Sequence, residues 1–209
     1  MNNLAHLVLS LPAILSALTI HEYAHGYVAY RMGDPTAKIA GRLTLNPIKH
    51  IDIFGFIAFL LFRFGWAKPV PVNPYNFRDV NKGMLYTSIA GSLANFLLAF
   101  VFGMIRRILP ITDILLPLVL IVEFGILFNL ILCIFNLLPI PPLDGSKVLF
   151  SLLPSRYRSI EYWLERYGFM ILIGLIFFDR ITGIPILWGW IGPFVMLFGR
   201  LFAGSLLIL

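Results

Sequence analysis

The sequence Leu18-Thr-Ile-His-Glu-Tyr-Ala-His-Gly-Tyr-Val-Ala-Tyr30 places two histidines and a glutamate inside an otherwise apolar run. His21, Glu22 and His25 form the pattern H-E-x-x-H. On an α-helix, four residues advance the chain by about 400°, so the two imidazoles project from one face about one turn apart. That spacing lets them hold one zinc ion, with Glu22 beside them to accept a proton from water. Catalytic zinc commonly takes three protein ligands, so the pattern needs a partner elsewhere in the chain.

The composition of the chain is that of a membrane protein. Of its 209 residues, 59% are hydrophobic and 12% are charged, whereas soluble domains are about half apolar and a quarter charged. A span takes about 20 apolar residues, so the length predicts an all-α polytopic membrane protein with about five to six transmembrane helices. Residues 1–209 are expected to form a single membrane-embedded domain. The net charge of +6 is assigned to loops at the membrane surface, and no nucleic-acid partner is expected.

Apolar runs separated by prolines, glycines and charges give the expected helices. Spans are expected over residues 4–30, 84–109 and 114–138, with further apolar runs at 168–178 and 184–209. An amphipathic helix is expected on the membrane surface over 147–166.

The stretch between the first two spans is expected to be irregular. Residues 36–46 alternate loosely around Gly41, which predicts a short β-hairpin. Residues 53–64 are apolar but too short to cross a bilayer, so a re-entrant segment is expected there. Residues 65–74 contain three prolines and are expected to form an extended loop.

The distribution of basic residues predicts the orientation of the chain. Twelve of the 16 Lys and Arg residues lie in three stretches, at 31–52, 63–82 and 139–167. By the positive-inside rule these stretches are cytoplasmic. The C-terminal ends of the first span and of the 114–138 span then meet on the cytoplasmic side. The stretches contain Arg31, Lys38, Arg42 and Lys49; Arg63, Lys68, Arg78 and Lys82; and Lys147, Arg156, Arg158 and Arg166.

At that cytoplasmic end lies Asn136-Leu-Leu-Pro-Ile-Pro-Pro-Leu-Asp-Gly145. The prolines end the helix and Gly145 permits a tight turn, so Asp144 can point back into the bundle. A carboxylate within a membrane is costly unless it is paired or bound to a metal. Asp144 is therefore the candidate third ligand; the alternative is an ordinary aspartate at the end of a helix.

Three further polar residues lie inside apolar runs. An amide in mid-span needs a partner, and that of Asn95 could either donate to a developing oxyanion or form an interhelical hydrogen bond. Asn129 lies seven residues before Asn136 and shares its helical face. Glu123 lies on another face, where a protonated structural carboxyl is expected and a role in gating is the alternative.

These motifs together resemble the site-2 proteases, a family of intramembrane zinc metalloproteases. The resemblance covers roughly residues 5–150 and is closest to the compact bacterial or archaeal type without a PDZ domain. It rests on His21-Glu-Tyr-Ala-His-Gly26, Gly41-Arg-Leu-Thr-Leu-Asn-Pro47, Gly65-Trp-Ala-Lys-Pro-Val-Pro-Val-Asn73, Gly91 to Asn95, and Asn136 to Gly145.

The resemblance implies that His21, His25 and Asp144 bind one zinc ion per chain and that Glu22 is the catalytic acid and base. Asn95 and Asn136 would hold the substrate near the metal. The implied partners are the lipid bilayer and a transmembrane protein substrate, such as an anti-sigma factor or a membrane-tethered regulator, cut by regulated intramembrane proteolysis. The implied location is a prokaryotic cell membrane with the active site toward the cytoplasm; association with further copies of the chain is left open.

Other functions remain as alternatives. A proteolytically inactive, zinc-binding membrane adaptor would keep the ligands, although it would not need Glu22. A small transporter would have to contain three agreeing motifs by coincidence. A prenyl-protein protease also places H-E-x-x-H in a membrane, but it would typically use a glutamate as the third ligand.

Overall fold

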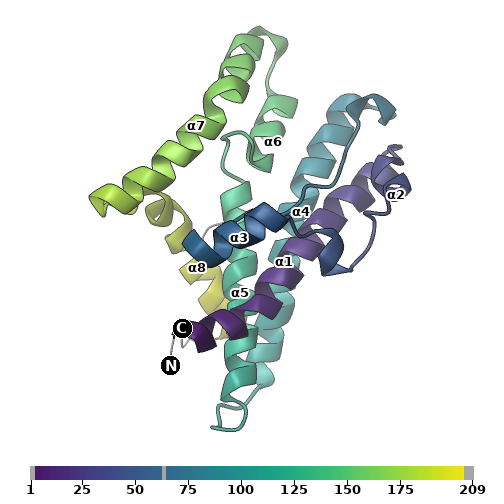
Figure 1. The fold of residues 1–209 in the computed structure, drawn as a ribbon. Coiled ribbons are helices and arrows are strands. Elements are labelled where there is room, and N and C mark those ends of the chain that lie inside the picture. Colours follow the sequence, from purple (N-terminus) through teal and green to yellow (C-terminus); the bar gives the residue numbers. More distant parts are fainter. Residues whose placement is uncertain (1–2, 63–64, 205–209) are drawn as a thin grey trace.

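The computed structural model describes residues 3–62 and 65–204, which form a bundle of helices (Figure 1). These residues contain eight α-helices and three short 3-10 helices, and their only bridge between extended segments joins Ile51 to Ala67. Arg63 of the second basic stretch and residues 205–209 of the last apolar run lie outside the described residues.

Three long helices form the centre of the molecule. α1 (Asn3–Arg31), α4 (Val80–Ile108) and α5 (Leu116–Asn136) pack against one another, and α8 (Ile186–Ala203) packs on α4 and α5 (Figure 1). The core between α4, α5 and α8 is apolar, and large apolar side chains also cover the outer faces of these helices. A helix that is apolar on its outer face faces lipid rather than water. The core residues are Ala99, Ile126, Leu130, Ile191, Val195, Phe202 and Ala203.

Four of the described helices, α1, α4, α5 and α8, are long and apolar enough to cross a membrane, fewer than the five to six expected. The difference lies in α7 (Arg158–Thr182), whose 25 residues begin with a polar half. The expected surface helix over 147–166 and the apolar run at 168–178 are therefore not separate elements. Instead, α6 (Asp144–Leu152) and the 3-10 turn η3 (Ser155–Tyr157) lead into α7, which contains the whole apolar run.

The β-hairpin expected over residues 36–46 is wrong. Thr36–Ile39 form a single helical turn, α2, and Pro47–Lys49 form the 3-10 turn η1. The Asp34 carboxylate accepts a hydrogen bond from the Thr36 backbone N–H at 3.1 Å, an arrangement that starts a helical turn rather than a strand. The loose alternation around Gly41 therefore reflected a turn and not a pleated ladder.

The segments that follow agree with the sequence. α3 (Ile53–Phe62) has ten residues, too few to span a bilayer, and it runs crosswise to the bundle in Figure 1. Residues 65–73 form an extended segment without helix, and the 3-10 turn η2 (Pro74–Asn76) leads from it to α4. The Asp79 carboxylate caps the first turn of α4 by accepting from the Lys82 N–H at 3.0 Å.

A buried ion pair joins α4 to α5. The Arg106 Nε donates to Glu123 Oε1 at 2.7 Å, with the Arg106 side chain 7% exposed and that of Glu123 fully buried. A protonated structural carboxyl was expected here, and the structure pairs Glu123 with a guanidinium. Next to it, Arg107 donates to the backbone carbonyls of Leu201 and Phe202, which are at the end of α8. The two arginines therefore tie α4 to α5 and to α8.

Removing one partner of this ion pair should destabilise the bundle without affecting the metal centre. Arg106→Met leaves the Glu123 charge without its guanidinium, and breaking a buried pair in this way costs about 3–5 kcal/mol. The check is the free energy of unfolding in mixed micelles, measured together with zinc content, with the exposed Arg166→Met as control. Equal stabilities for the two variants would contradict the ion pair's contribution.

Candidate metal centre

The H-E-x-x-H motif lies on α1, where both imidazoles point into the bundle. His21 and His25 are buried, and their rings meet edge to face with centroids 4.5 Å apart. Asp144 is the first residue of α6 and is also buried. It reaches the histidines because Gly145 lies against the carbonyls of Leu137 and Leu138, where no Cβ would fit. The close approach folds α6 back under the end of α5, as the sequence predicted.

Three ligand atoms converge on one point. Asp144 Oδ2 lies 3.2 Å from His21 Nε2 and 3.0 Å from His25 Nε2, and the two Nε2 atoms are 3.0 Å apart. A tetrahedral zinc ion with ligands at ~2.0–2.1 Å would separate its ligand atoms by about 3.3 Å. The spacing of the three atoms therefore suits one face of such a site, and these residues can hold a metal ion.

The hydrogen-bond partners of the two rings assign their tautomers. His21 Nδ1 lies 3.0 Å from Asn95 Oδ1, and His25 Nδ1 lies 2.6 Å from the carbonyl oxygen of Thr87. Both partners are acceptors, so each Nδ1 carries the proton and each Nε2 presents its lone pair. Two lone pairs and a carboxylate oxygen then meet with no proton between them. A bound cation would offset the electrostatic repulsion between these three atoms. Two histidines and a carboxylate are a donor set typical of catalytic zinc.

One face of α4 holds both histidines in place. Thr87, Gly91 and Asn95 are spaced four residues apart and therefore lie along one face of the helix. Thr87 and Asn95 supply the acceptors for the two rings, and Gly91 lies between them. A Cβ at Gly91 would be 2.5 Å from His25 Nε2 and 2.7 Å from His21 Nε2, so only glycine leaves room for the rings.

Asn95 is fully buried behind the His21 ring. Its amide nitrogen donates to the Ala17 carbonyl at 3.2 Å and to Asn129 Oδ1 at 3.1 Å, while Asn129 in turn donates to the Gly125 carbonyl. Both amide protons of Asn95 are thereby used, and its oxygen faces His21. These contacts support the His21 ring from behind, as outer partners do in metal sites.

Glu22 lies on the same helix as the histidines and is held by the extended segment. Its Oε2 accepts a hydrogen bond from the backbone N–H of Val70 at 2.8 Å. The carboxylate is 9% exposed and lines the same cleft as the three candidate ligands. The sequence did not reveal this contact, because residues 65–74 were expected only to be an extended loop.

The three candidate ligands and Glu22 line one cleft of about 720 Å³. Its walls are mostly apolar and come from α1, the extended segment, α4, α5, α6 and α7. Asn136 is part of the wall, with its amide donating to the carbonyl of Leu132 in its own helix at 3.0 Å. The structure thus brings five of the six candidate residues to the cleft, and Asn95 lies behind it.

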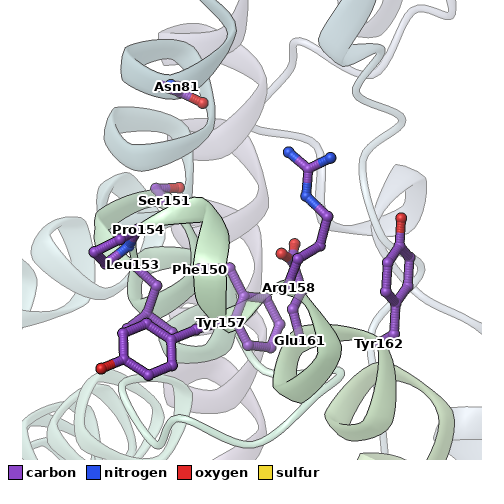
Figure 2. Close-up of a pocket in the computed structure, with 9 residues that line it drawn as sticks. All are labelled: Asn81, Phe150, Ser151, Leu153, Pro154, Tyr157, Arg158, Glu161 and Tyr162. Atoms are coloured by element: carbon purple, nitrogen blue, oxygen red, sulfur yellow. The ribbon is translucent and has the colours of Figure 1, made fainter.

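A second cavity, of about 370 Å³, lies between the start of α4, the end of α6 and the start of α7 (Figure 2). It shares no lining residue with the cleft. Its wall contains Arg158 and Glu161 but no histidine. The cavity therefore does not extend the metal centre.

Comparisons with known proteins agree with this site. A sequence model described as Peptidase family M50 matches residues 112–175, which include Asp144. YwhC of Bacillus subtilis, provisionally named a zinc metalloprotease, is 41% identical over 185 residues, or 84% of this chain and 82% of YwhC. The chain belongs to peptidase family M50. This is the site-2 protease family that the motifs resemble.

Other M50 relatives carry the same provisional name. MJ0611 of Methanocaldococcus jannaschii is 34% identical over 142 residues, or 68% of this chain and 69% of MJ0611. Rip2 of Mycolicibacterium smegmatis is 29% identical over 181 residues, or 81% of this chain and 66% of Rip2. No solved structure matches the chain significantly. With its four apolar helices, this M50 member is a multi-pass membrane metalloprotease, and its donor set and family both indicate zinc.

The space at Gly91 gives a test of the centre that leaves all of its ligands in place. Gly91→Ala pushes a methyl group against both imidazoles, so zinc affinity should fall about 10–100-fold, the range for disturbed ligand orientation. The check is zinc retained against a competing chelator, with Asp144→Ala for comparison. Gly174→Ala on α7, where a Cβ would meet open space, is the matched control. Equal zinc affinity for the two glycine variants would contradict this packing.

Proposed function

We propose that this protein is an intramembrane zinc metalloprotease that hydrolyses peptide bonds in or near the transmembrane segments of membrane proteins. The observation that carries the proposal is the convergence of His21 Nε2, His25 Nε2 and Asp144 Oδ2 in a cleft within apolar helices, with Glu22 lining the same cleft. We treat residues 1–209 as one catalytic domain, because each of these side chains comes from the same bundle.

The residues of the cleft divide the work of hydrolysis. His21, His25 and Asp144 hold the zinc ion, which supplies Lewis-acid activation of water and of the scissile carbonyl when bound. Glu22 accepts the proton of the attacking water and later delivers it to the leaving amine. The Val70 N–H fixes one Glu22 oxygen, which leaves Oε1 available for that transfer. Burial keeps bulk water from competing for the same groups.

The two asparagines take different parts in this proposal. Asn95 orients His21, since its amide protons are used by Ala17 and Asn129. Asn136 stands on the cleft wall beside the metal ligands and is the amide placed to contact a substrate. Its present donation to Leu132 is within its own helix, so the amide can turn toward a substrate carbonyl without opening a contact between helices.

The substrate is proposed to be a single-span membrane protein, and the apolar cleft wall supports a transmembrane segment. Anti-sigma factors and membrane-tethered regulators, cut by regulated intramembrane proteolysis, are the substrates that the family resemblance suggests. A helical substrate must unwind first, because helical hydrogen bonds occupy its carbonyls. The extended residues 66–72, which line the cleft from Trp66 to Val72, offer backbone against which an unwound segment can lie.

The metal centre is proposed to open toward the cytoplasm. In Figure 1 the C-terminal end of α1, the N-terminal end of α4 and the turn between α6 and α7 lie at one end of the bundle, and the α4–α5 connection lies at the other. Basic residues of all three stretches flank this first end, among them Arg31, Lys82 and Arg158, and basic loops remain in the cytoplasm. His25 is six residues before Arg31, or about 9 Å along the helix, so the cut would fall in the cytoplasmic part of the bilayer.

Cysteine labelling tests this orientation. In a Cys133→Ser background, Lys82→Cys should react with an impermeant reagent only after the cytoplasmic side is opened. Asp113→Cys, in the α4–α5 connection, should react from the outside. Both positions are exposed, so access depends on the side of the membrane. The opposite pattern would reverse the proposed topology.

Replacement of Glu22 separates the protease from an inactive, zinc-binding adaptor. Glu22→Gln keeps the size of the side chain but cannot accept the proton, so cleavage of a single-span substrate in proteoliposomes should fall by ~10²–10⁴-fold with zinc retained. Glu165→Gln, an exposed glutamate on α7, is the control and should cleave normally. Unaltered cleavage by Glu22→Gln would remove this residue from the mechanism. Absence of cleavage by parent protein with full zinc would favour the adaptor.

A further inference from the structure

We infer that Asp34 is a positioning residue of the protease, which acts through the extended segment on Glu22. This inference rests on the proposed role of Glu22 as acid and base. Asp34 follows α1 and lies outside the cleft lining, yet its relative exposure is 0%. A buried carboxylate in a surface turn is costly unless it is fully hydrogen-bonded. The hydrogen-bond partners of Asp34 therefore show which segments of the chain it holds together.

The Asp34 carboxylate joins two parts of the chain that are far apart in sequence. Oδ2 accepts from the Asn73 backbone N–H at 2.7 Å, and Oδ1 accepts from Asn76 Nδ2 at 2.8 Å. Oδ1 also accepts from both the backbone and the hydroxyl of Thr36. Burial raises the pKa of Asp34, but the hydrogen bonds from Asn76, Thr36 and Asn73 outweigh it and hold the pKa below its ordinary value. The carboxylate is therefore charged at neutral pH and accepts strong hydrogen bonds.

Asp34 is one of two anchors for the extended segment. At the other anchor, the Lys68 N–H donates to the His50 carbonyl at 2.9 Å and Arg42 Nη2 donates to the Lys68 carbonyl at 2.6 Å. Val70 lies between the anchors, two residues after Lys68 and three residues before Asn73. Its N–H holds Glu22 Oε2. Fixing both ends of so short a stretch fixes where that N–H points, because three residues span at most about 10 Å.

Loss of the Asp34 anchor should therefore misplace Glu22 while leaving the metal ligands untouched. His21 and His25 take their orientation from α4 and not from this segment. A displacement of about 1 Å at a reacting group can cost roughly 100-fold in rate. For Asp34→Ala we expect kcat to fall about 10–100-fold, with zinc content changed less than twofold.

The matched control is Asp79→Asn. Asp79 is also an aspartate that caps a helical turn on this end of the bundle, and it is exposed. Its cap belongs to α4 and not to the extended segment. This variant should keep the parent kcat. Asp34→Asn, which preserves shape but replaces one acceptor oxygen with a donor, should show a loss in the same direction as Asp34→Ala.

A double mutant distinguishes positioning from general stability. If Asp34 acts through Glu22, then Asp34→Ala should cause no further loss in a Glu22→Gln background, because the group that it positions is already inactive. A purely structural role would lower the residual activity again. Full additivity of the two losses, or a kcat for Asp34→Ala within twofold of the parent, would overturn the inference.

A local probe keeps the test decisive if Asp34→Ala does not fold. In the Cys133→Ser background, a Val72→Cys reporter should be alkylated several-fold faster with Asp34→Asn than with Asp79→Asn, since only the former frees the segment. Equal rates would refute the anchor. The Glu22→Gln variant separates the two proposals. If Glu22→Gln is fully active, the assignment of Glu22 as acid and base is wrong. If Glu22→Gln is inactive but Asp34→Ala is fully active, only the inference about Asp34 is wrong.

Discussion

Three electron-rich atoms meet at one point in the interior of this protein, and much of the bundle serves to keep them there. His21 Nε2, His25 Nε2 and Asp144 Oδ2 lie 3.0–3.2 Å apart, and the acceptors behind each imidazole direct its proton away from the others. In an apolar interior such an arrangement is unfavourable without a cation. The free energy of metal binding therefore contributes to the stability of the folded bundle, as it does in other metal sites.

The requirement for that arrangement accounts for polar features across the apolar helices. Along one face, α4 contributes the side-chain amide of Asn95 and the backbone carbonyl of Thr87. Between them, Gly91 has no side chain and so leaves room for the imidazoles. Asn129 extends the support to α5. The buried amides of Asn95 and Asn129 donate to groups on a neighbouring helix or on their own helix, and these hydrogen bonds help to fix how the helices pack. The three candidate ligands and Glu22 thus lie on helices, and only Glu22 is also held by the extended segment.

The sequence predicted the all-α membrane class and the meeting of the three candidate ligands, but not every element between them. Spacing alone brought His21 and His25 to one face, and the prolines with Gly145 returned Asp144 to them. The β-hairpin expected at 36–46 failed because the alternation was weak and the hydrogen bond from the Thr36 N–H to Asp34 favoured a turn. The break expected between residues 166 and 168 is absent, because a polar and an apolar half can belong to one helix. The contacts of Val70, Thr87 and Asp34 could not be foreseen, since backbone groups of distant segments carry no signal in side-chain patterns.

Zinc-edge X-ray absorption on the purified protein tests the converging ligands most directly. The predicted result is one zinc per chain with a first shell of nitrogen and oxygen at about 2.0–2.1 Å, including the outer-ring scattering of two imidazoles. The spectrum should lose one oxygen ligand in Asp144→Ala. A sulfur ligand near 2.3 Å, which Cys133 alone could supply, or a first shell without imidazole would contradict the account.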